Sequence, residues 1–90
     1  MRSYKLVGKM NKDLKRIIKR GYDISKLDAA ILLLRDENPI PRIYNKHPLS
    51  GEYSGCFSLS LEPDWRLIYY IEGDTVTLMK TGTHSDLYEK

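Results

Sequence analysis

Apolar side chains in the first half of the chain recur with the period of an α-helix. The first stripe consists of Met10, Leu14, Ile17 and Ile18. It predicts a helix with Asn11 as its N-cap and Gly21 at its C-terminal end. The second stripe consists of Leu27, Ala30, Ile31 and Leu34. This second helix is predicted to begin at a capping pattern at residues 25–28 and to end before Pro39. Because only the short segment 21–24 links the two helices, they are expected to form a helical hairpin.

The second half of the chain has the patterns of β-strands. Residues 53–61 alternate between apolar and polar side chains, which is typical of a half-buried strand with one polar face. Residues 65–71 are apolar on both faces except at Arg66, which indicates a central strand. After a tight turn at residues 72–74, a third strand is predicted at residues 75–81.

The order of these elements predicts an α+β fold in a single domain that spans residues 1–90. A first strand at residues 3–7 precedes the two-helix hairpin, and the hairpin packs on an antiparallel sheet built from the later strands. A further capping pattern at residues 83–86 predicts a short C-terminal helix that carries Leu87 and Tyr88.

Charge is distributed unevenly along the 90 residues. The net charge of +3 divides into +7 for residues 1–46 and −4 for residues 47–90. The first predicted helix contributes Lys15, Arg16 and Lys19 to the basic half. Such a helix presents either a merely solvated face or a docking surface for phosphate or an acidic peptide, and the charge alone leaves both readings open.

Composition excludes several classes of protein and of site. No apolar run approaches 18 residues, so no membrane-spanning segment is expected. The first residues lack the apolar stretch of a signal peptide, which favours a cytoplasmic protein. The single cysteine, Cys56, can form neither an internal disulfide nor a cysteine-based zinc site, and we interpret it as an ordinary strand residue.

The residues suited to acid–base or phosphate chemistry lie at the ends of the predicted elements, where function concentrates. They are His47 on a loop, Asp64 at a strand turn, Lys80 at the end of the last strand, His84 just after it and Tyr88 in the tail. Because the last strand returns toward the turn at residues 62–64, Lys80 and His84 are expected to approach Asp64. Histidine exchanges protons near neutral pH, and RNA supplies its own nucleophile, the 2′-OH, so these groups suffice for RNA cleavage without a metal.

Three segments together resemble the YafQ-type toxins of the RelE/ParE superfamily. They are His-Pro-Leu-Ser-Gly at residues 47–51, Glu-Pro-Asp-Trp at residues 62–65 with Leu-Ile-Tyr at residues 67–69, and Thr-Gly-Thr-His-Ser-Asp-Leu-Tyr at residues 81–88. The resemblance implies a RelE-like fold and the toxin of a bacterial type II toxin–antitoxin pair, which cuts mRNA on the ribosome with neither metal nor cofactor. It also implies a cognate antitoxin as partner, with operator DNA contacted only through that antitoxin.

The resemblance also implies roles for single residues. By analogy with the family, His84 is the general acid, Asp64 is the general base and His47 supports the substrate or its phosphate. Trp65 matches the aromatic residue that follows the aspartate and is grouped with the RNA-binding residues. Tyr88 takes the place of a C-terminal aromatic residue that can stack on a base.

The chain departs from the family pattern at three positions. Ser60 stands where the family has a further active-site histidine, Phe57 where an arginine is usual, and Lys80 where an arginine precedes Thr-Gly. Lysine keeps the charge but lacks the bidentate fork of arginine, and serine cannot replace histidine as a proton carrier. A weakened toxin that acts mainly through antitoxin binding and operon autoregulation is therefore one alternative, and a toxin with a non-RNA target such as gyrase is another.

Within the toxin reading, the basic first helix has two possible partners. Lys15, Arg16 and Lys19 can bind ribosomal RNA, with an affinity that salt weakens, or receive an antitoxin segment that folds on binding. Both can hold, because a bound antitoxin would then block access to the ribosome.

Overall fold

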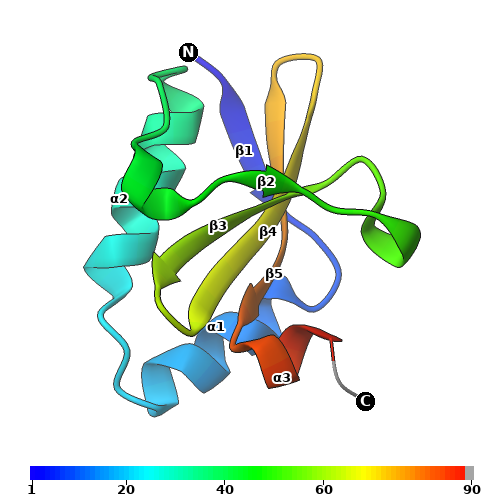
Figure 1. Cartoon of the computed structure of the whole chain (residues 1–90). Coiled ribbons are helices and arrows are strands. Elements are labelled where there is room, and N and C mark those ends of the chain that lie inside the picture. Colours follow the sequence, from blue (N-terminus) through cyan, green and yellow to red (C-terminus); the bar gives the residue numbers. More distant parts are fainter. Residues whose placement is uncertain (89–90) are drawn as a thin grey trace.

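Five strands form one sheet in the order β1-β5-β4-β3-β2, with helices packed around it (Figure 1). The structure is a computed structural model and describes residues 1–88. Along the chain, with η for a 3-10 helix, the elements are β1 (Ser3–Leu6), α1 (Met10–Lys19), α2 (Ile24–Arg35), η1 (Arg42–Tyr44), β2 (His47–Pro48), η2 (Gly51–Tyr53), β3 (Phe57–Glu62), β4 (Trp65–Glu72), β5 (Thr75–Gly82) and α3 (His84–Tyr88). The predicted α+β fold is confirmed.

The sheet is mostly antiparallel, as expected, but one of its edges is parallel. β2, β3, β4 and β5 are antiparallel neighbours, whereas β1 pairs in parallel with β5 from Ser3 opposite Thr75 to Leu6 opposite Leu78. The apolar–polar pattern of a short strand does not specify its partner, so the sequence could not show this pairing. β1 leads into α1 and α2, which return the chain to the opposite edge of the sheet at β2.

The helices α1 and α2 form the main core with one face of the sheet. In Figure 1, α1 lies below the sheet and α2 rises along its side, joined by a short link. The buried side chains of this core are Met10, Ile17, Leu27, Ala30, Leu34, Leu59, Trp65, Leu67, Tyr69, Val76 and Leu78. Burial of each large apolar side chain contributes roughly 1.5–3 kcal/mol. Both predicted apolar stripes therefore supply the core, except for Ile18 of the first stripe, whose exposed fraction is 58%.

The short helix α3 packs on the opposite face of the sheet. Its Leu87 forms a second buried cluster with Cys56 and Ile68, and partly buried residues such as Tyr53 and Met79 pack against this cluster. The polar face predicted for residues 53–61 is therefore only partly solvated, because Ser58 is buried on this side while Ser54 is exposed and Ser60 half-buried. Ser58 has an exposed fraction of 0%. Within residues 1–88 no helix is both long and apolar enough to cross a membrane.

Three local predictions needed correction. α1 begins at Met10 with Lys9 in the N-cap position, and no side chain caps it, so Asn11 is not the cap. α2 begins one residue before Ser25, because the side chain of Asp23 accepts a hydrogen bond from the Ser25 backbone N–H at 3.0 Å. The strand predicted from residue 53 starts at residue 57, since residues 51–53 form η2.

The end of α1 was predicted correctly. Gly21 adopts a φ of 84°, a left-handed conformation that suits glycine. This turn lets the Tyr22 backbone N–H donate to the Ile17 carbonyl oxygen at 3.2 Å, which satisfies a carbonyl left open at the helix end.

Candidate active site

Sheet register places several polar side chains on the face that α3 covers. Ile68 of β4 packs in the second buried cluster, beside Leu87 of α3, which we call the α3 cluster. Residues that pair with Ile68, or that lie two positions from it along β4, share its face of the sheet. These residues are Ser58, Ser60, Arg66 and Lys80, and His47 joins them as the cross-strand partner of Ser58. We call this set of residues, with Ile68, the α3 face.

A β-bulge in β5 keeps Lys80 on the α3 face. Ile68 pairs with Lys80, whereas the next residue of β4, Tyr69, pairs with Leu78, so Met79 is the extra residue. Leu78 lies in the main core and Met79 packs in the α3 cluster. Strict alternation from Leu78 would have turned Lys80 toward the core. The bulge therefore re-aims a cation toward the candidate site.

Asp64 and His84 lie together at one corner of this face. Asp64 is in the turn between β3 and β4, and His84 is the first residue of α3. The backbone N–H of His84 donates to Asp64 Oδ1 at 3.3 Å, and both residues are exposed. The expected approach of His84 to Asp64 is confirmed, whereas that of Lys80 stays a prediction, since its Nζ bonds to Tyr53.

Two tyrosines and Lys80 line a hollow of about 460 Å³ beside His84. The centre of the His84 ring lies 4.9 Å from that of Tyr88, and the Tyr88 ring meets Tyr53 edge-on at 6.1 Å. Lys80 Nζ donates to the Tyr53 hydroxyl oxygen at 3.3 Å. Sequence reasoning missed Tyr53, because the residue was assigned to a regular strand and not to the loop that η2 forms.

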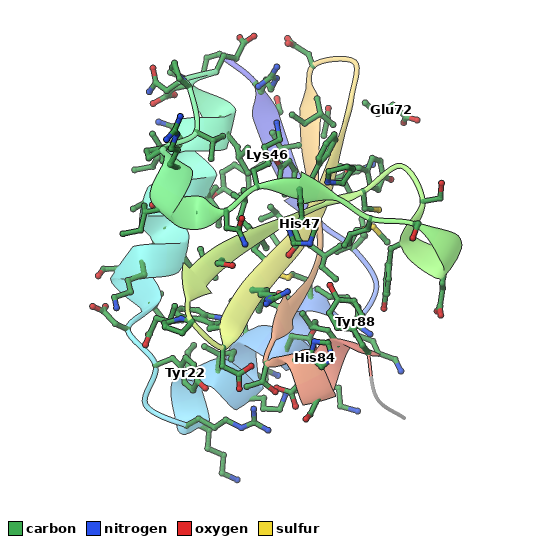
Figure 2. The ribbon with its side chains drawn as sticks, viewed as in Figure 1. Tyr22, Lys46, His47, Glu72, His84 and Tyr88 are labelled. Carbon is green, nitrogen blue, oxygen red and sulfur yellow. The ribbon has the colours of Figure 1, made fainter. Side chains whose placement is uncertain are left out.

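His47 reaches the same side of the molecule from β2. Figure 2 shows His47 on β2 above and His84 with Tyr88 on α3 below, all on the front of the view. The Nδ1 atom of His47 lies 3.1 Å from the Asn45 carbonyl oxygen. In the neutral tautomer that donates through Nδ1, the Nε2 atom remains available to accept a proton or a hydrogen bond.

Trp65 is a core residue and does not contact solvent. Its exposed fraction is 0%, its Nε1–H donates to Thr81 Oγ1 at 2.8 Å, and its ring meets Tyr22 edge-on at 5.1 Å. The grouping of Trp65 with RNA-binding residues is therefore corrected. The ring faces the helices because β4 alternates, so Trp65 positions the end of β5 from inside the core.

The predicted basic residues of α1 divide into two kinds. Lys15 and Lys19 are exposed. Arg16 is half-buried, forms an ion pair with Asp13 through its NH2 group, and has its Nε 4.0 Å from Asp86 Oδ1. Arg16 is thus engaged in holding the fold, whereas Lys15 and Lys19 form no ion pair within residues 1–88.

Asp86 anchors α3 to α1. Its Oδ2 accepts from Arg20 at 2.6 Å and its Oδ1 accepts from the same guanidinium at 3.2 Å. Asp86 also caps α3, because its side chain accepts from the Thr83 backbone N–H while its own N–H donates to the Thr83 hydroxyl oxygen. The hydrogen bonds from Arg20, then those from Thr83, hold the pKa of Asp86 well below its usual range, despite opposing desolvation.

Gly82 makes this arrangement possible. A Cβ atom at residue 82 would lie 2.8 Å from the Cβ of Asp86, which is too close. Any larger residue would therefore push the α3 anchor away from the end of β5.

The family departures at residues 57 and 60 differ in their consequences. Phe57 lies on the core side, where its ring stacks at 5.9 Å on Tyr69, and Lys46 Nζ lies 4.7 Å from the ring centre. A side chain at residue 57 thus faces away from His47 and His84. Ser60 belongs to the α3 face, and its cross-strand partner is Arg66.

Arg66 is the second site residue that sequence reasoning missed. It stood out in the sequence only as the one charge in a central strand. Its place on the α3 face depends on the register between β3, β4 and β5, which pairs it with Ser60 and Gly82. A search for cations two positions after the turn aspartate would have found it.

Neither a metal cluster nor a reactive thiol stands out in the described part of the chain. Among residues 1–88, no group of three or more histidine, cysteine or acidic side chains could hold a metal ion. Burial raises the pKa of the Cys56 thiol, which lies 3.4 Å from the sulfur of Met79. Cys56 is thus a structural residue, as interpreted, although it lies just before β3 and not in the strand.

Known proteins resemble the chain over nearly its whole length. A family profile described as "Bacterial toxin of type II toxin-antitoxin system, YafQ" matches residues 2–89. The mRNA interferase toxin YafQ of Escherichia coli strain K12 is 38% identical over 82 residues, which cover 90% of this chain and 89% of that protein.

Solved structures agree in fold. The crystal structure of the E. coli DinJ–YafQ complex contains a chain that is 35% identical, with a TM-score of 0.88 and coverage of 98% of this chain and 99% of that one. The crystal structure of a metal-bound toxin from Helicobacter pylori is 33% identical, with a TM-score of 0.90 and coverage of 98% and 100%.

Proposed function

The chain belongs to the YafQ family of toxins from bacterial type II toxin–antitoxin systems, and we propose that it is an mRNA interferase that cuts mRNA on the ribosome without using a metal. The contact between Asp64 and the start of α3 at His84 carries the proposal. The backbone N–H of His84 donates to the Asp64 carboxylate, which places these two residues together at an exposed corner of the molecule. The name of the E. coli relative, an mRNA interferase, supports the same activity.

The proposed reaction needs two proton transfers and one phosphoryl transfer. Asp64 accepts the proton of the ribose 2′-OH, the 2′-oxygen bonds to phosphorus, and the bond from phosphorus to the 5′-oxygen breaks. His84 donates a proton to the leaving 5′-oxygen. The products are a 2′,3′-cyclic phosphate and a 5′-hydroxyl. His47 and Lys80, on the same face, would bind the phosphate, and Tyr88 would stack on a base.

The open geometry of the site supports dependence on the ribosome. Asp64 and His84 are exposed, and the neighbouring hollow is shallow and lined largely by side chains of a loop and of α3. A site that does not enclose its substrate reacts faster when the ribosome holds the RNA in place. The exposed Lys15 and Lys19 of α1 provide a surface for ribosomal RNA.

The partner proposed for the toxin is a cognate antitoxin. The E. coli relative was crystallised in complex with DinJ. A corresponding protein would bind this chain and block its access to the ribosome, and operator DNA would be contacted only through it.

Cleavage by the purified chain in a cell-free translation reaction tests the activity. A defined mRNA is translated with the wild-type chain, and 5′ ends are mapped by primer extension. New ends are expected only while the mRNA is being translated. Asp64→Asn and His84→Gln are each expected to lower the cleavage rate by about 10²–10⁴-fold, because each removes one proton-transfer group.

The matched control for Asp64 is Asp74, an exposed aspartate in the turn at the other end of β4. Asp74→Asn should cut at the wild-type rate. If the two site variants cut as fast as the control, Asp64 and His84 are not the catalytic pair. If the wild-type chain cuts nothing while it still binds its antitoxin, Ser60 supports the alternative of a weakened toxin that acts in operon autoregulation.

A further inference from the structure

We propose that Arg66 binds the scissile phosphate. Arg66 is the cross-strand partner of Ser60, and Ser60 stands where the family pattern has a histidine. The inference rests on the proposed RNA cleavage. It adds to that reaction a phosphate-binding cation that neither the sequence motifs nor the similarity to known proteins identifies. Three observations carry it.

The first observation is a guanidinium group with unused hydrogen-bonding capacity. The Nε atom of Arg66 is shielded from solvent and has no hydrogen-bond partner among residues 1–88. The ion pairs found within those residues do not include Arg66 either. A buried N–H donor without an acceptor costs about 1–3 kcal/mol, so it calls for an explanation. An anionic ligand that supplies an oxygen would provide one.

The second observation is where Arg66 lies. It pairs with Ser60 of β3 on one side and with Gly82 of β5 on the other, and neither neighbour carries charge. Asp64 precedes Arg66 by two residues, and His84 follows Gly82 by two. The α3 face also carries His47 and Lys80. Arg66 thus lies between the strand that lost the family histidine and the pair proposed to transfer protons.

The third observation is that three of the five buried side-chain atoms without a partner among residues 1–88 lie on this side of the sheet, the other two being Arg16 Nε on α1 and the Tyr69 hydroxyl in the main core. The hydroxyl groups of Ser58 and Tyr88 are also buried without a partner among residues 1–88. Ser58 pairs with Ile68, and Tyr88 packs against the same cluster as Ile68. Three unsatisfied polar groups therefore lie on the α3 side, and Arg66 is the charged one among them.

The chemistry of the guanidinium selects phosphate as that ligand. Its planar fork matches two oxygens of a phosphate group, which a lysine cannot do. As the 2′-oxygen bonds to phosphorus and the bond to the 5′-oxygen breaks, charge builds on the two non-bridging oxygens. Arg66 would stabilise that charge and would exchange no proton, so the proton transfers stay with Asp64 and His84. Serine at residue 60 has no charge to offer, and Arg66 supplies it from the adjacent strand.

Cleavage by arginine variants tests the role. Arg66→Met is expected to lower the cleavage rate on translating ribosomes by about 10²–10³-fold, because it removes a donor that acts on the transition state. The cleavage rate of Arg66→Lys, which keeps the charge but not the planar fork, should lie between those of the wild type and Arg66→Met. Arg42→Met, at an exposed arginine of η1, is the matched control and should cut like the wild type. Adding Ser60→His to Arg66→Met should recover part of the lost rate.

A binding measurement keeps the inference testable if the methionine variant does not fold. The wild-type chain is titrated with inorganic phosphate, with sodium chloride of equal ionic strength as reference, while the Nε–H signals of its arginines are followed by NMR. A saturable shift is expected at Arg66 and none at Arg42. Wild-type cleavage rates in folded Arg66→Met, or no phosphate-dependent shift at Arg66, would overturn the proposal.

The two readouts separate this inference from the proposed function. If the wild-type chain does not cut mRNA but Arg66 shows the phosphate shift, the proposed activity fails and the phosphate site stands. If the wild-type chain cuts mRNA and the arginine variants cut equally well, the activity stands and the inference about Arg66 fails.

Discussion

At the scale of single residues, the side of the strand decides which groups can react. Trp65 and Arg66 are neighbours in β4, yet Trp65 is enclosed by the core and Arg66 belongs to the α3 face. Sequence motifs identify both residues as unusual but do not show which of them faces the site. The same holds for Lys80, whose direction depends on a bulge that the alternation pattern does not reveal. Asp64 and His84 could be predicted because both lie at element ends that a meander brings together.

Replacement of Trp65 distinguishes a structural role from RNA binding. Trp65→Phe removes the indole N–H that donates to the buried Thr81 hydroxyl oxygen and leaves unfilled space in the core. The free energy of unfolding is expected to fall by about 1–3 kcal/mol, measured by urea denaturation. Cleavage by the folded variant should stay close to that of the wild type. Unchanged stability together with lost cleavage would show that Trp65 acts on the substrate instead.

At the scale of elements, α3 depends on its anchor. A helix of five residues does not persist alone in water, so its contacts with the rest of the chain must hold His84 and Tyr88 in place. The capping pattern at residues 83–86 was readable from the sequence. The bond from Asp86 to Arg20 joins residues 66 positions apart, and no local pattern could predict it. The loop that forms η2 and the parallel strand β1 were hidden for the same reason.

Acid sensitivity tests this anchor. The pKa of Asp86 is depressed in the folded chain, chiefly by hydrogen bonds from Arg20, so its ionised form stabilises the fold at pH values above the ordinary pKa of aspartate, near 4. That contribution is lost as the pH falls below about 4. Asp86→Asn should therefore have a lower melting temperature than the wild type at pH 7, as measured by circular dichroism. Between pH 7 and pH 3 the melting temperature of this variant should fall less than that of the wild type.

Asp74→Asn is the control for this comparison, because Asp74 is exposed in the hairpin turn far along β4 and β5 from α3. Its melting temperature should follow that of the wild type at both pH values. A curve for Asp86→Asn that runs parallel to the wild type would contradict the assigned role of the anchor.

At the scale of the whole molecule, the division of charge corresponds to a division of surfaces. The basic half of the sequence supplies α1 and α2, and the acidic half supplies most of the sheet. The exposed Lys15 and Lys19 lie on α1, which is tied to α3 through Arg20 and Asp86. A partner that covers α1 would therefore also lie next to the candidate site. This arrangement suits both proposed occupants, ribosomal RNA and an antitoxin.

The chemistry of the cut ends tests the central claim most directly. mRNA is recovered from translating ribosomes treated with the wild-type chain, and the groups on both sides of each cut are identified by enzymatic labelling and mass spectrometry. Attack by the 2′-oxygen predicts a 2′,3′-cyclic phosphate, or the 3′-phosphate formed from it, and a 5′-hydroxyl. A 3′-hydroxyl with a 5′-phosphate would contradict the proposed roles of Asp64 and His84, because those ends require an external water as the nucleophile.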